Sequence, residues 1–231
     1  MAAAPIAGTR VRLAGLVSRP DLNGRLGVVV DSEEATAQGR VAVELYARDP
    51  AAAAAPESVC AKAANLEPLP PQPAVEIRGS QVTAAQLSGE RSQALARGRG
   101  RGWMDCPVPE LLGLPIKMLR LGTPRLQNES LATYLLVSPS HGFAPNDVQA
   151  NGLGAVVVAR SDGEAITPDE VWSLHNYMCN LMDEWPKWLD DPEGTREEKR
   201  RALTPAAFRA FTENNANMEG GEEEDEEEEE D

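Results

Sequence analysis

Residues 16–31, LVSRPDLNGRLGVVVD, decide the fold of the first part of the chain. Asn23-Gly24 is a strong signal for a tight hairpin turn, because both residues tolerate a positive φ. After the turn, the larger side chains at 26, 28 and 30 alternate with their neighbours, which is the period of two that a half-buried strand shows. The stretch therefore predicts a strand at residues 26–31 directly after a hairpin turn.

Further short strands are expected on both sides of this stretch. They are Thr9–Leu16, Arg40–Tyr46 and Ser58–Ala63, with a polar loop at residues 32–38. Short strands at this spacing are typical of a small antiparallel barrel. The sequence therefore predicts a small antiparallel β-barrel over residues 8–70.

The segment Val11–Val30 (VRLAGLVSRPDLNGRLGVVV) resembles the small Src-homology-3-type barrel with the glycine placement of KOW modules. The closing phrase Lys62–Pro68 (KAANLEP) resembles a version found in algal proteins that also carry MYND fingers or ankyrin repeats. The resemblance covers about a quarter of the chain and implies a barrel fold. The zinc-binding cysteines of a MYND finger are absent, and the remainder of the chain is not assigned to a family.

Composition restricts what such a barrel can bind. Barrels of this class bind methylated side chains or proline-rich peptides with clustered aromatic residues, and Tyr46 is the only aromatic residue within residues 8–70. A nucleic-acid-binding version needs a basic face, whereas this segment holds seven basic and eight acidic residues. Arg10, Arg12 and Arg25 could gather in one patch, but we favour the interpretation that they are solvated positions of amphipathic strands.

The middle of the chain, residues 71–104, is expected to be a linker that is rich first in proline and then in Arg-Gly. LPPQP at residues 69–73 is typical of a stiff polyproline segment. Residues 76–102 carry five arginines against two acids and end in RGRGRG, and such repeats can contact RNA. The candidate RNA contacts are Arg91, Arg97, Arg99 and Arg101. A flexible linker is the favoured interpretation, and a third is that the acidic C-terminus folds back on these arginines.

Residues 105–213 are predicted to form a small α+β domain in which helices back a sheet. Strands are expected at Ile116–Leu121, Ala132–Ser138 and Gly154–Ala159. Thr167-Pro168-Asp169-Glu170 combines an N-cap, a proline at the first helical position and a glutamate three residues on, which predicts a helix start. That helix is expected to run to Trp185 and to stop at Pro186, with shorter helices after Thr195 and Thr204.

Three sets of residues were candidates for chemistry, and none predicts a catalytic or metal site. Cys106, His141 and Asn146 follow the chain order of a papain-like triad but lack its local signatures. His175 and Cys179 could share a metal, but two ligands do not make a site, so a half-buried structural pair is favoured. The loop at residues 138–147 (SPSHGFAPND) is where an enzyme of an unrecognised family would place its site. No cofactor is expected, because the phosphate-binding glycine motifs are absent.

Aromatic residues are the candidates for a surface that binds a protein partner. They are Trp103, Phe143, Trp172 and Trp188. Trp172 and Trp188 fall outside the main apolar stripe of the helix that begins after Thr167, and exposed tryptophans are enriched where proteins bind partners. The alternative is that these two residues cover a second core face against the sheet or the barrel.

The net charge of −15 comes mostly from the C-terminus, because residues 219–231 supply eleven acids. Like charges repel, so residues 214–231 are expected to be a disordered acidic tail that binds basic partners or only solubilises the chain. The three cysteines are far apart and odd in number, which indicates a reducing compartment. No apolar run reaches the roughly 18 residues that cross a bilayer, and no membrane partner is expected.

These features favour a non-enzymatic adaptor located inside the cell, in the cytoplasm or the nucleus. Its expected partner is a protein, and a basic one where the acidic tail takes part. The first alternative is an RNA-associated factor that binds through the Arg-Gly linker. The second is an enzyme of an unrecognised family with its site near His141. The oligomeric state is left open by the sequence.

Overall fold

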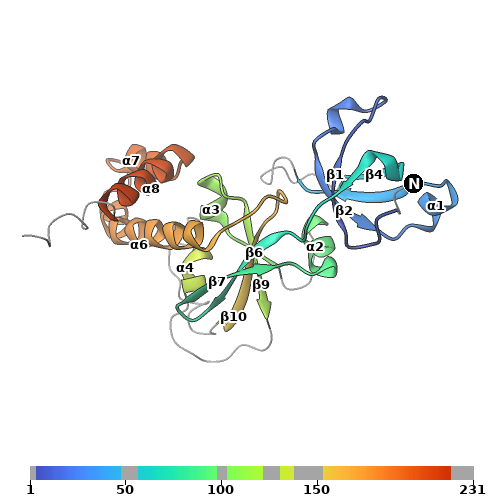
Figure 1. Cartoon of the computed structure of the whole chain (residues 1–231). Coiled ribbons are helices and arrows are strands. Elements are labelled where there is room, and N and C mark those ends of the chain that lie inside the picture. The colour runs from blue at the N-terminus through green and yellow to red at the C-terminus, as the bar shows by residue number, and fades with distance from the viewer. Residues whose placement is uncertain (1–3, 48–56, 98–102, 122–130, 138–152, 220–231) are drawn as a thin grey trace, which may run out of the picture.

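The computed structural model describes residues 4–47, 57–97, 103–121, 131–137 and 153–219 of the 231-residue chain. These residues form two five-stranded antiparallel sheets, with helices packed against them (Figure 1). The α+β class predicted from the sequence is therefore confirmed.

The first sheet has the strand order β4-β3-β2-β1-β5. Its strands are β1 (Arg10–Leu13), β2 (Leu26–Val30), β3 (Val41–Leu45), β4 (Ser58–Ala61) and β5 (Leu66–Pro68). Three short helical turns connect them, namely η1 (Pro20–Leu22), α1 (Glu33–Ala37) and η2 (Ala63–Asn65). The expected strands are present with shorter ends, but the polar loop at residues 32–38 contains α1, which Ser32 caps by accepting from the Ala35 amide. Because β4 and β5 are the edges of the sheet, hydrogen bonds do not close it into a barrel.

Strand β2 is buried on both faces, which explains its continuous run of valines. Val29 packs into the core of the first sheet together with Val11 and Val43. Leu26 and Val28 face the other way and pack against residues of the second sheet. The first sheet therefore lies between its own core and the rest of the molecule.

The second sheet has the strand order β7-β6-β10-β9-β8. Its strands are β6 (Pro73–Arg78), β7 (Gln81–Gln86), β8 (Trp103–Asp105), β9 (Ile116–Leu121) and β10 (Ala155–Arg160). Helix α2 (Gly89–Ala96) also lies within residues 71–104, and it contacts β2 and β3. The prediction that residues 71–104 form a linker is therefore wrong for residues 73–96, which build two strands and a helix. Residues 98–102, which include Arg99 and Arg101, lie outside the described residues.

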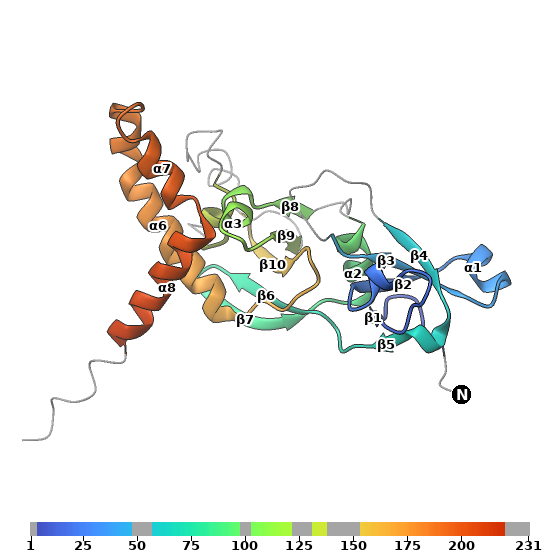
Figure 2. The ribbon, with the colours of Figure 1, turned by 90° about the horizontal axis from the view of Figure 1, so that it is seen from above.

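Helices cover one face of the second sheet. They are α3 (Pro107–Leu111), α4 (Leu131–Leu135) and α6 (Pro168–Asp190), and the helices α7 (Arg196–Ala202) and α8 (Pro205–Glu219) form a further layer on α6. Long helix α6 crosses the end of the sheet near β7, and α7 and α8 pack on its outer side (Figure 2). The shared core includes Ile77 of β6, Val156 of β10 and Leu174 of α6, all fully buried.

Three expectations for the C-terminal half are corrected. The run Ala132–Ser138 is not a strand, since residues 131–135 form α4. Helix α6 does not stop at Pro186 but continues to Asp190, with Pro186 inside it. The acidic tail was expected to begin at residue 214, yet α8 extends to Glu219, and residues 220–231 lie outside the described residues.

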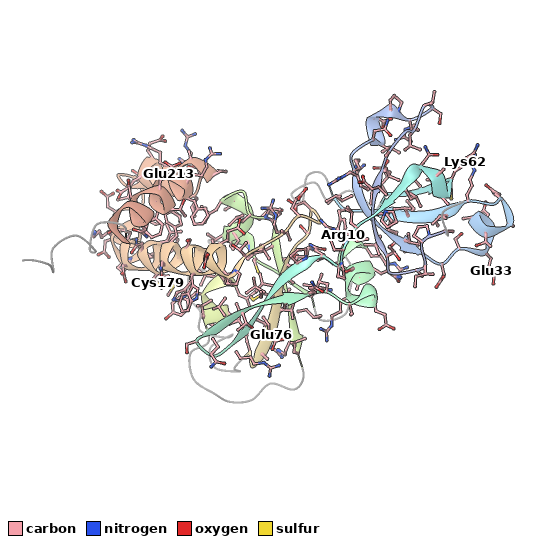
Figure 3. The ribbon with its side chains drawn as sticks, viewed as in Figure 1. Arg10, Glu33, Lys62, Glu76, Cys179 and Glu213 are labelled. Carbon is pink, nitrogen blue, oxygen red and sulfur yellow. The ribbon has the colours of Figure 1, made fainter. Side chains whose placement is uncertain are left out.

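A second apolar core joins the two sheets. We call the first sheet with its connecting turns the first unit, and the second sheet with its helices, including α2, the second unit. Leu26, Val28 and Tyr46 of the first unit pack against residues of α2, β6 and β10 in the second unit. Arg10 lies at this junction (Figure 3), where its Nη2 donates to the Gly163 carbonyl oxygen at 2.6 Å. Gln93 of α2 donates to the Val29 carbonyl oxygen at 3.3 Å. The two sheets are therefore joined by both apolar packing and hydrogen bonds.

Candidate interaction surface

Helix α6 carries the best candidate site. Hydrogen bonds between side chains and backbone fix the position at which this helix begins. The Thr167 hydroxyl accepts from the Glu170 amide at 3.2 Å, and the Glu170 carboxylate accepts from the Thr167 amide at 2.8 Å. This reciprocal capping box fixes the first turn. The residue that follows shortly after it, Trp172, projects from the helix with 39% of its surface exposed. A large apolar side chain is thus presented on a well-anchored helix.

Trp172 belongs to a cluster of four residues that we call the Trp172 surface. It consists of Tyr134 from α4 and Trp172, His175 and Cys179 from α6. The His175 ring meets Tyr134 edge to face at a centroid distance of 4.9 Å and Trp172 at 5.8 Å. Cys179 Sγ lies 3.7 Å from His175 Nε2, one helical turn away. Figure 3 marks the position of Cys179 on α6.

The electrostatics of the cluster are those of neutral groups. Partial burial lowers the pKa of His175, so its imidazole is uncharged at neutral pH. Burial, and then the nearby Asp183, raise the pKa of the Cys179 thiol. The pair is therefore a thiol beside a neutral imidazole, which is not the activated thiolate that nucleophilic catalysis requires.

Acidic side chains flank the Trp172 surface along α6. Asp169 and Asp183 lie on the same stripe of the helix as Trp172 and Cys179, because they are three or four residues from them. Both carboxylates are exposed. The surface therefore has one carboxylate a turn before the indole and a second one at its far end, beside Cys179.

The other aromatic candidates do not join this surface. Trp188 is only 4% exposed and packs against Trp185 inside the core, so its prediction as a partner-binding residue is wrong. Trp103 on β8 is half-buried beside the core that joins the two sheets. Phe143 and His141 lie outside the described residues.

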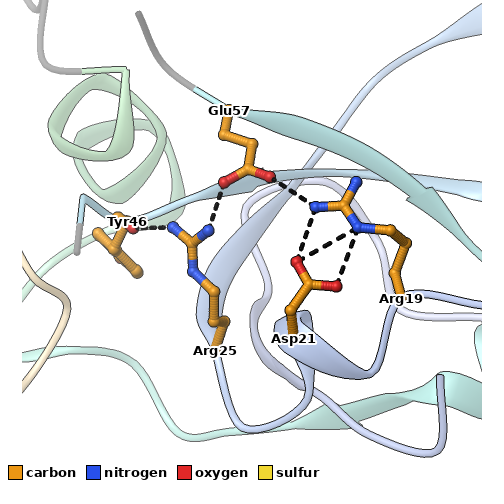
Figure 4. A network of polar contacts seen from close by, with 5 residues as sticks. All are labelled: Arg19, Asp21, Arg25, Tyr46 and Glu57. Atoms are coloured by element: carbon orange, nitrogen blue, oxygen red, sulfur yellow. Dashed lines mark hydrogen bonds and ion pairs between the residues drawn. The ribbon is translucent and has the colours of Figure 1, made fainter. Parts of the chain in front are cut away.

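The arginines of the first sheet are engaged within the molecule. Arg12 pairs with Glu67 at 3.6 Å, and Arg10 donates to the Gly163 carbonyl, as described above. Arg25 contacts Glu57 and donates to the Tyr46 carbonyl oxygen at 2.8 Å (Figure 4). These three arginines therefore do not form a shared basic patch. The interpretation that they are solvated holds for Arg12 but is wrong for Arg10 and Arg25, which are partly buried.

Two sets of side-chain contacts hold the loop between β1 and β2. Arg19 donates to Asp21 and also reaches Glu57 (Figure 4). Asn23 closes the loop by accepting from the Leu16 amide at 2.8 Å and donating to its carbonyl at 3.1 Å. The charged residues of LVSRPDLNGRLGVVVD thus build the loop itself.

The candidate RNA contacts are not brought together by the described residues. Arg97 forms an ion pair with Glu44 of β3 at 2.8 Å, across the junction of the two units. Arg91 is exposed on α2. The structure therefore gives Arg97 a structural contact between α2 and the first sheet.

The described surface includes two hollows that are lined by residues of the helices and of the first sheet. A groove of about 460 Å³ on the first unit is lined by the N-terminal arm at residues 4–7 and by residues near the end of β2 and the start of β3. A shallower hollow of about 550 Å³ lies between α6, α7 and α8, beside Tyr177 and Glu198. Neither groups titratable residues with a shifted pKa around a shared centre, in contrast to the Trp172 surface.

The buried cysteine considered as a nucleophile is part of the core. Cys106 precedes α3 and is 1% exposed. Burial raises the pKa of its thiol well above the ordinary value, so it is protonated at neutral pH. Cys106 therefore contributes packing in this structure.

Comparisons with protein-family models, with curated proteins and with solved structures find no match for this chain. Within the described ranges, no helix has the length and apolar character needed to cross a membrane. The same residues contain no group of three or more His, Cys, Asp or Glu side chains arranged to hold a metal ion. A function for this chain must therefore be inferred from the geometry of its own residues.

Sequence reasoning found Trp172 but missed Tyr134. The run that contains Tyr134 is short and apolar, and periodicity alone does not distinguish a short buried strand from a short helix. Its misassignment as a strand hid the contact with His175, because a strand residue would have been placed in the sheet. No local signal in the sequence pointed to Gly163 as a junction residue.

Proposed function

We propose that this protein is a non-enzymatic interaction protein that binds a basic segment of a partner protein through the Trp172 surface. The observation that carries the proposal is the exposure of Trp172, at 39%, on a helix whose other large aromatic residues are mostly buried. Tryptophan is enriched among residues that dominate binding energy, since its large ring is costly to expose to water.

The chemistry of the surface favours lysine or arginine in the partner. An ammonium or guanidinium group over an indole face gains about 0.5–2 kcal/mol from the cation–π interaction. Asp169 lies one turn before Trp172 and Asp183 lies beside Cys179 at the other end of the surface, and both would pair with further positive charges of the partner. A basic partner also agrees with the strong negative charge of residues 219–231.

The engaged arginines support a protein partner over RNA. Arg10, Arg12, Arg25 and Arg97 all contact carboxylates or carbonyls of the same chain. An RNA-binding groove needs such side chains to be free for phosphates. Of the four candidate RNA contacts, Arg91 is exposed, and Arg99 and Arg101 lie outside the described residues.

The proposal includes two finer assignments. The first is that the first unit is a Src-homology-3-type module. This assignment is supported by the antiparallel order of β1 to β4 and by the pairing of β5 with β1. The protein works inside the cell, in the cytoplasm or the nucleus, which the three unpaired cysteines support.

Affinity capture from the native lysate tests the proposal. Tagged wild-type protein is compared with Trp172→Ala, and each capture is split into nuclease-treated and untreated halves. We expect a defined set of basic proteins that survives nuclease and that Trp172→Ala reduces about tenfold or more, as the loss of a tryptophan anchor does.

Leu189→Ala is the matched control, because Leu189 is a 61% exposed apolar residue on the same helix. It should leave the captured set unchanged. An identical set with Trp172→Ala would overturn the assignment of the surface, and loss of the set on nuclease treatment would make RNA the partner.

A further inference from the structure

The four edge strands of the two sheets differ in how they are protected. Free edges expose unpaired backbone groups, and proteins protect them with short strands, charges or prolines. Three of the four follow that rule. Strand β4 is four residues long and is followed by Lys62. Strand β5 is three residues long and contains Glu67 and Pro68. Strand β8 is three residues long, contains Asp105 and is soon followed by Pro107.

Strand β7 has none of these protections. It is six residues long, QVTAAQ, and contains no charge and no proline. Among the strands that the structure describes, β6 is the only one paired with it. The strand borders the second sheet on the side away from β8 (Figure 2).

The outward backbone groups of β7 can be identified from its register. The Leu87 amide donates to the Gln72 carbonyl, so the Leu87 amide points toward β6. Amides alternate in direction along a strand, so those of Ala85 and Thr83 also face β6. The amides and carbonyls of Val82, Ala84 and Gln86 therefore point to the free edge.

We propose that β7 pairs with β7 of a second copy of this chain, antiparallel and around a two-fold axis near Ala84. Such a pairing would join the two five-stranded sheets into one continuous sheet across the dimer. The outward groups of Val82 and Gln86 would meet those of Gln86 and Val82 in the other copy, with Ala84 opposite Ala84.

A second copy is the occupant that the composition of β7 favours. Like charges directly opposite each other destabilise a strand pair, and an uncharged strand can pair with itself without that repulsion. The small side chains of Ala84 and Ala85 allow close approach, and Gln81 and Gln86 provide amides at both ends of the pair. This inference does not depend on the Trp172 surface.

Sedimentation equilibrium over a range of concentrations tests the pairing. The wild type should approach twice the 24.8 kDa mass of one chain as concentration rises. Ala84→Pro should stay monomeric, because proline removes an outward amide while leaving the bonds to β6 intact. Thr83→Lys should also stay monomeric through repulsion between the two copies, and Ser58→Lys on the edge strand β4 is the control that should still dimerise.

Amide hydrogen exchange followed by NMR gives a second readout. In the dimer, the amides of Val82, Ala84 and Gln86 should be protected at high concentration and lose that protection on dilution, whereas those of Thr83 and Ala85 stay protected. A wild type that is monomeric at every concentration would overturn the proposal, as would a dimer that persists in both Ala84→Pro and Thr83→Lys. Protection of the three outward amides in a monomer would also overturn it, since another segment of the same chain would then cover the edge.

Discussion

Tyr46 is buried at the contact between the two units. It is 2% exposed, and its hydroxyl group makes no hydrogen bond of ordinary length, although Ser92 lies close enough to lower its pKa slightly. The ring lies on Gly163, where a Cβ atom would overlap it, and Gly163 has a φ of 83° that favours glycine. The Tyr46 ring therefore fits here because residue 163 is a glycine and has no Cβ atom.

Burial raises the pKa of Tyr46 to about 12, although nearby Arg10 lowers it in part. The folded state therefore disfavours the phenolate, and the resulting stability is present below the ordinary tyrosine pKa of about 10 and is lost as pH rises toward 12. We expect the free energy of unfolding to fall by about 1 kcal/mol at pH 11 because of this group alone. Urea unfolding of wild type and Tyr46→Phe between pH 8 and 11 measures the difference.

Tyr46→Phe should remove that part of the pH dependence, and at pH 8 it should change stability by less than about 1 kcal/mol, because the lost hydroxyl group makes no hydrogen bond of ordinary length. The burial of Tyr177 also raises its pKa, so Tyr177→Phe is the control for a second tyrosine outside the junction. If wild type and Tyr46→Phe lose stability in parallel up to pH 11, Tyr46 is not buried at the junction.

Trp172 and Trp188 were both predicted to bind a partner, and they differ in exposure because of where helix α6 ends. Trp188 lies three residues after Trp185, so it belongs to the buried stripe of α6 once the helix continues past Pro186. Ending the helix at Pro186 removed that stripe and made Trp188 look like a surface residue. Trp172 lies off the stripe in either case, and its exposure could be expected from helical spacing alone.

At the scale of elements, α6 shows packing that overrides local preference. A proline inside a helix lacks the amide of one hydrogen bond and clashes with the preceding turn, at about 3 kcal/mol. Pro186 is exposed, so it gains little from burial itself. The burial of Trp185 and Trp188 on either side of it keeps the helix continuous to Asp190.

Replacing this proline should therefore stabilise the protein. We expect Pro186→Ala to raise the free energy of unfolding by about 1–3 kcal/mol, since it restores the amide and removes the clash. The measurement is chemical denaturation followed by circular dichroism at 222 nm. Pro168→Ala is the matched control, because a proline at the first helical position lacks only an amide that the helix does not use, and its change should stay within about 0.5 kcal/mol. Equal effects of the two variants would contradict this account.

The elements that the sequence missed share a cause. Residues 73–86 alternate as strands do, but LPPQP at residues 69–73 before them and RGRGRG after them are typical of a linker. The second sheet is formed by strands far apart in sequence, and β6 obtains its central neighbour from β10, which follows some eighty residues later. Local composition carries no information about that partner. The capping box at Thr167 and a turn at Asn23-Gly24 were predictable because their physics is local, although only Gly24 has a positive φ and the turn ends a longer loop between β1 and β2.

At the scale of the whole molecule, the shared core makes the two sheets depend on each other. Leu26, Val28 and Tyr46 would be exposed to water if the first unit stood alone, because their partners belong to α2, β6 and β10. Arg10, Gln93 and Arg97 add polar contacts across the same junction. We therefore expect the two units to unfold together in one cooperative transition.

All four tryptophans lie at residue 103 or later, so their fluorescence reports on the second unit, whereas far-UV circular dichroism reports on both. In the wild type the two urea-unfolding curves should coincide, as in a two-state transition. In Gly163→Ala the new methyl group overlaps the Tyr46 ring, so stability should fall by about 2–4 kcal/mol and the curves should separate. Gly24→Ala has a similar φ of 85° but open space around it, so it should cost only about 1 kcal/mol and leave the curves coincident. Coincident curves in Gly163→Ala, with a loss no larger than that of Gly24→Ala, would show that the Tyr46–Gly163 contact does not couple the units.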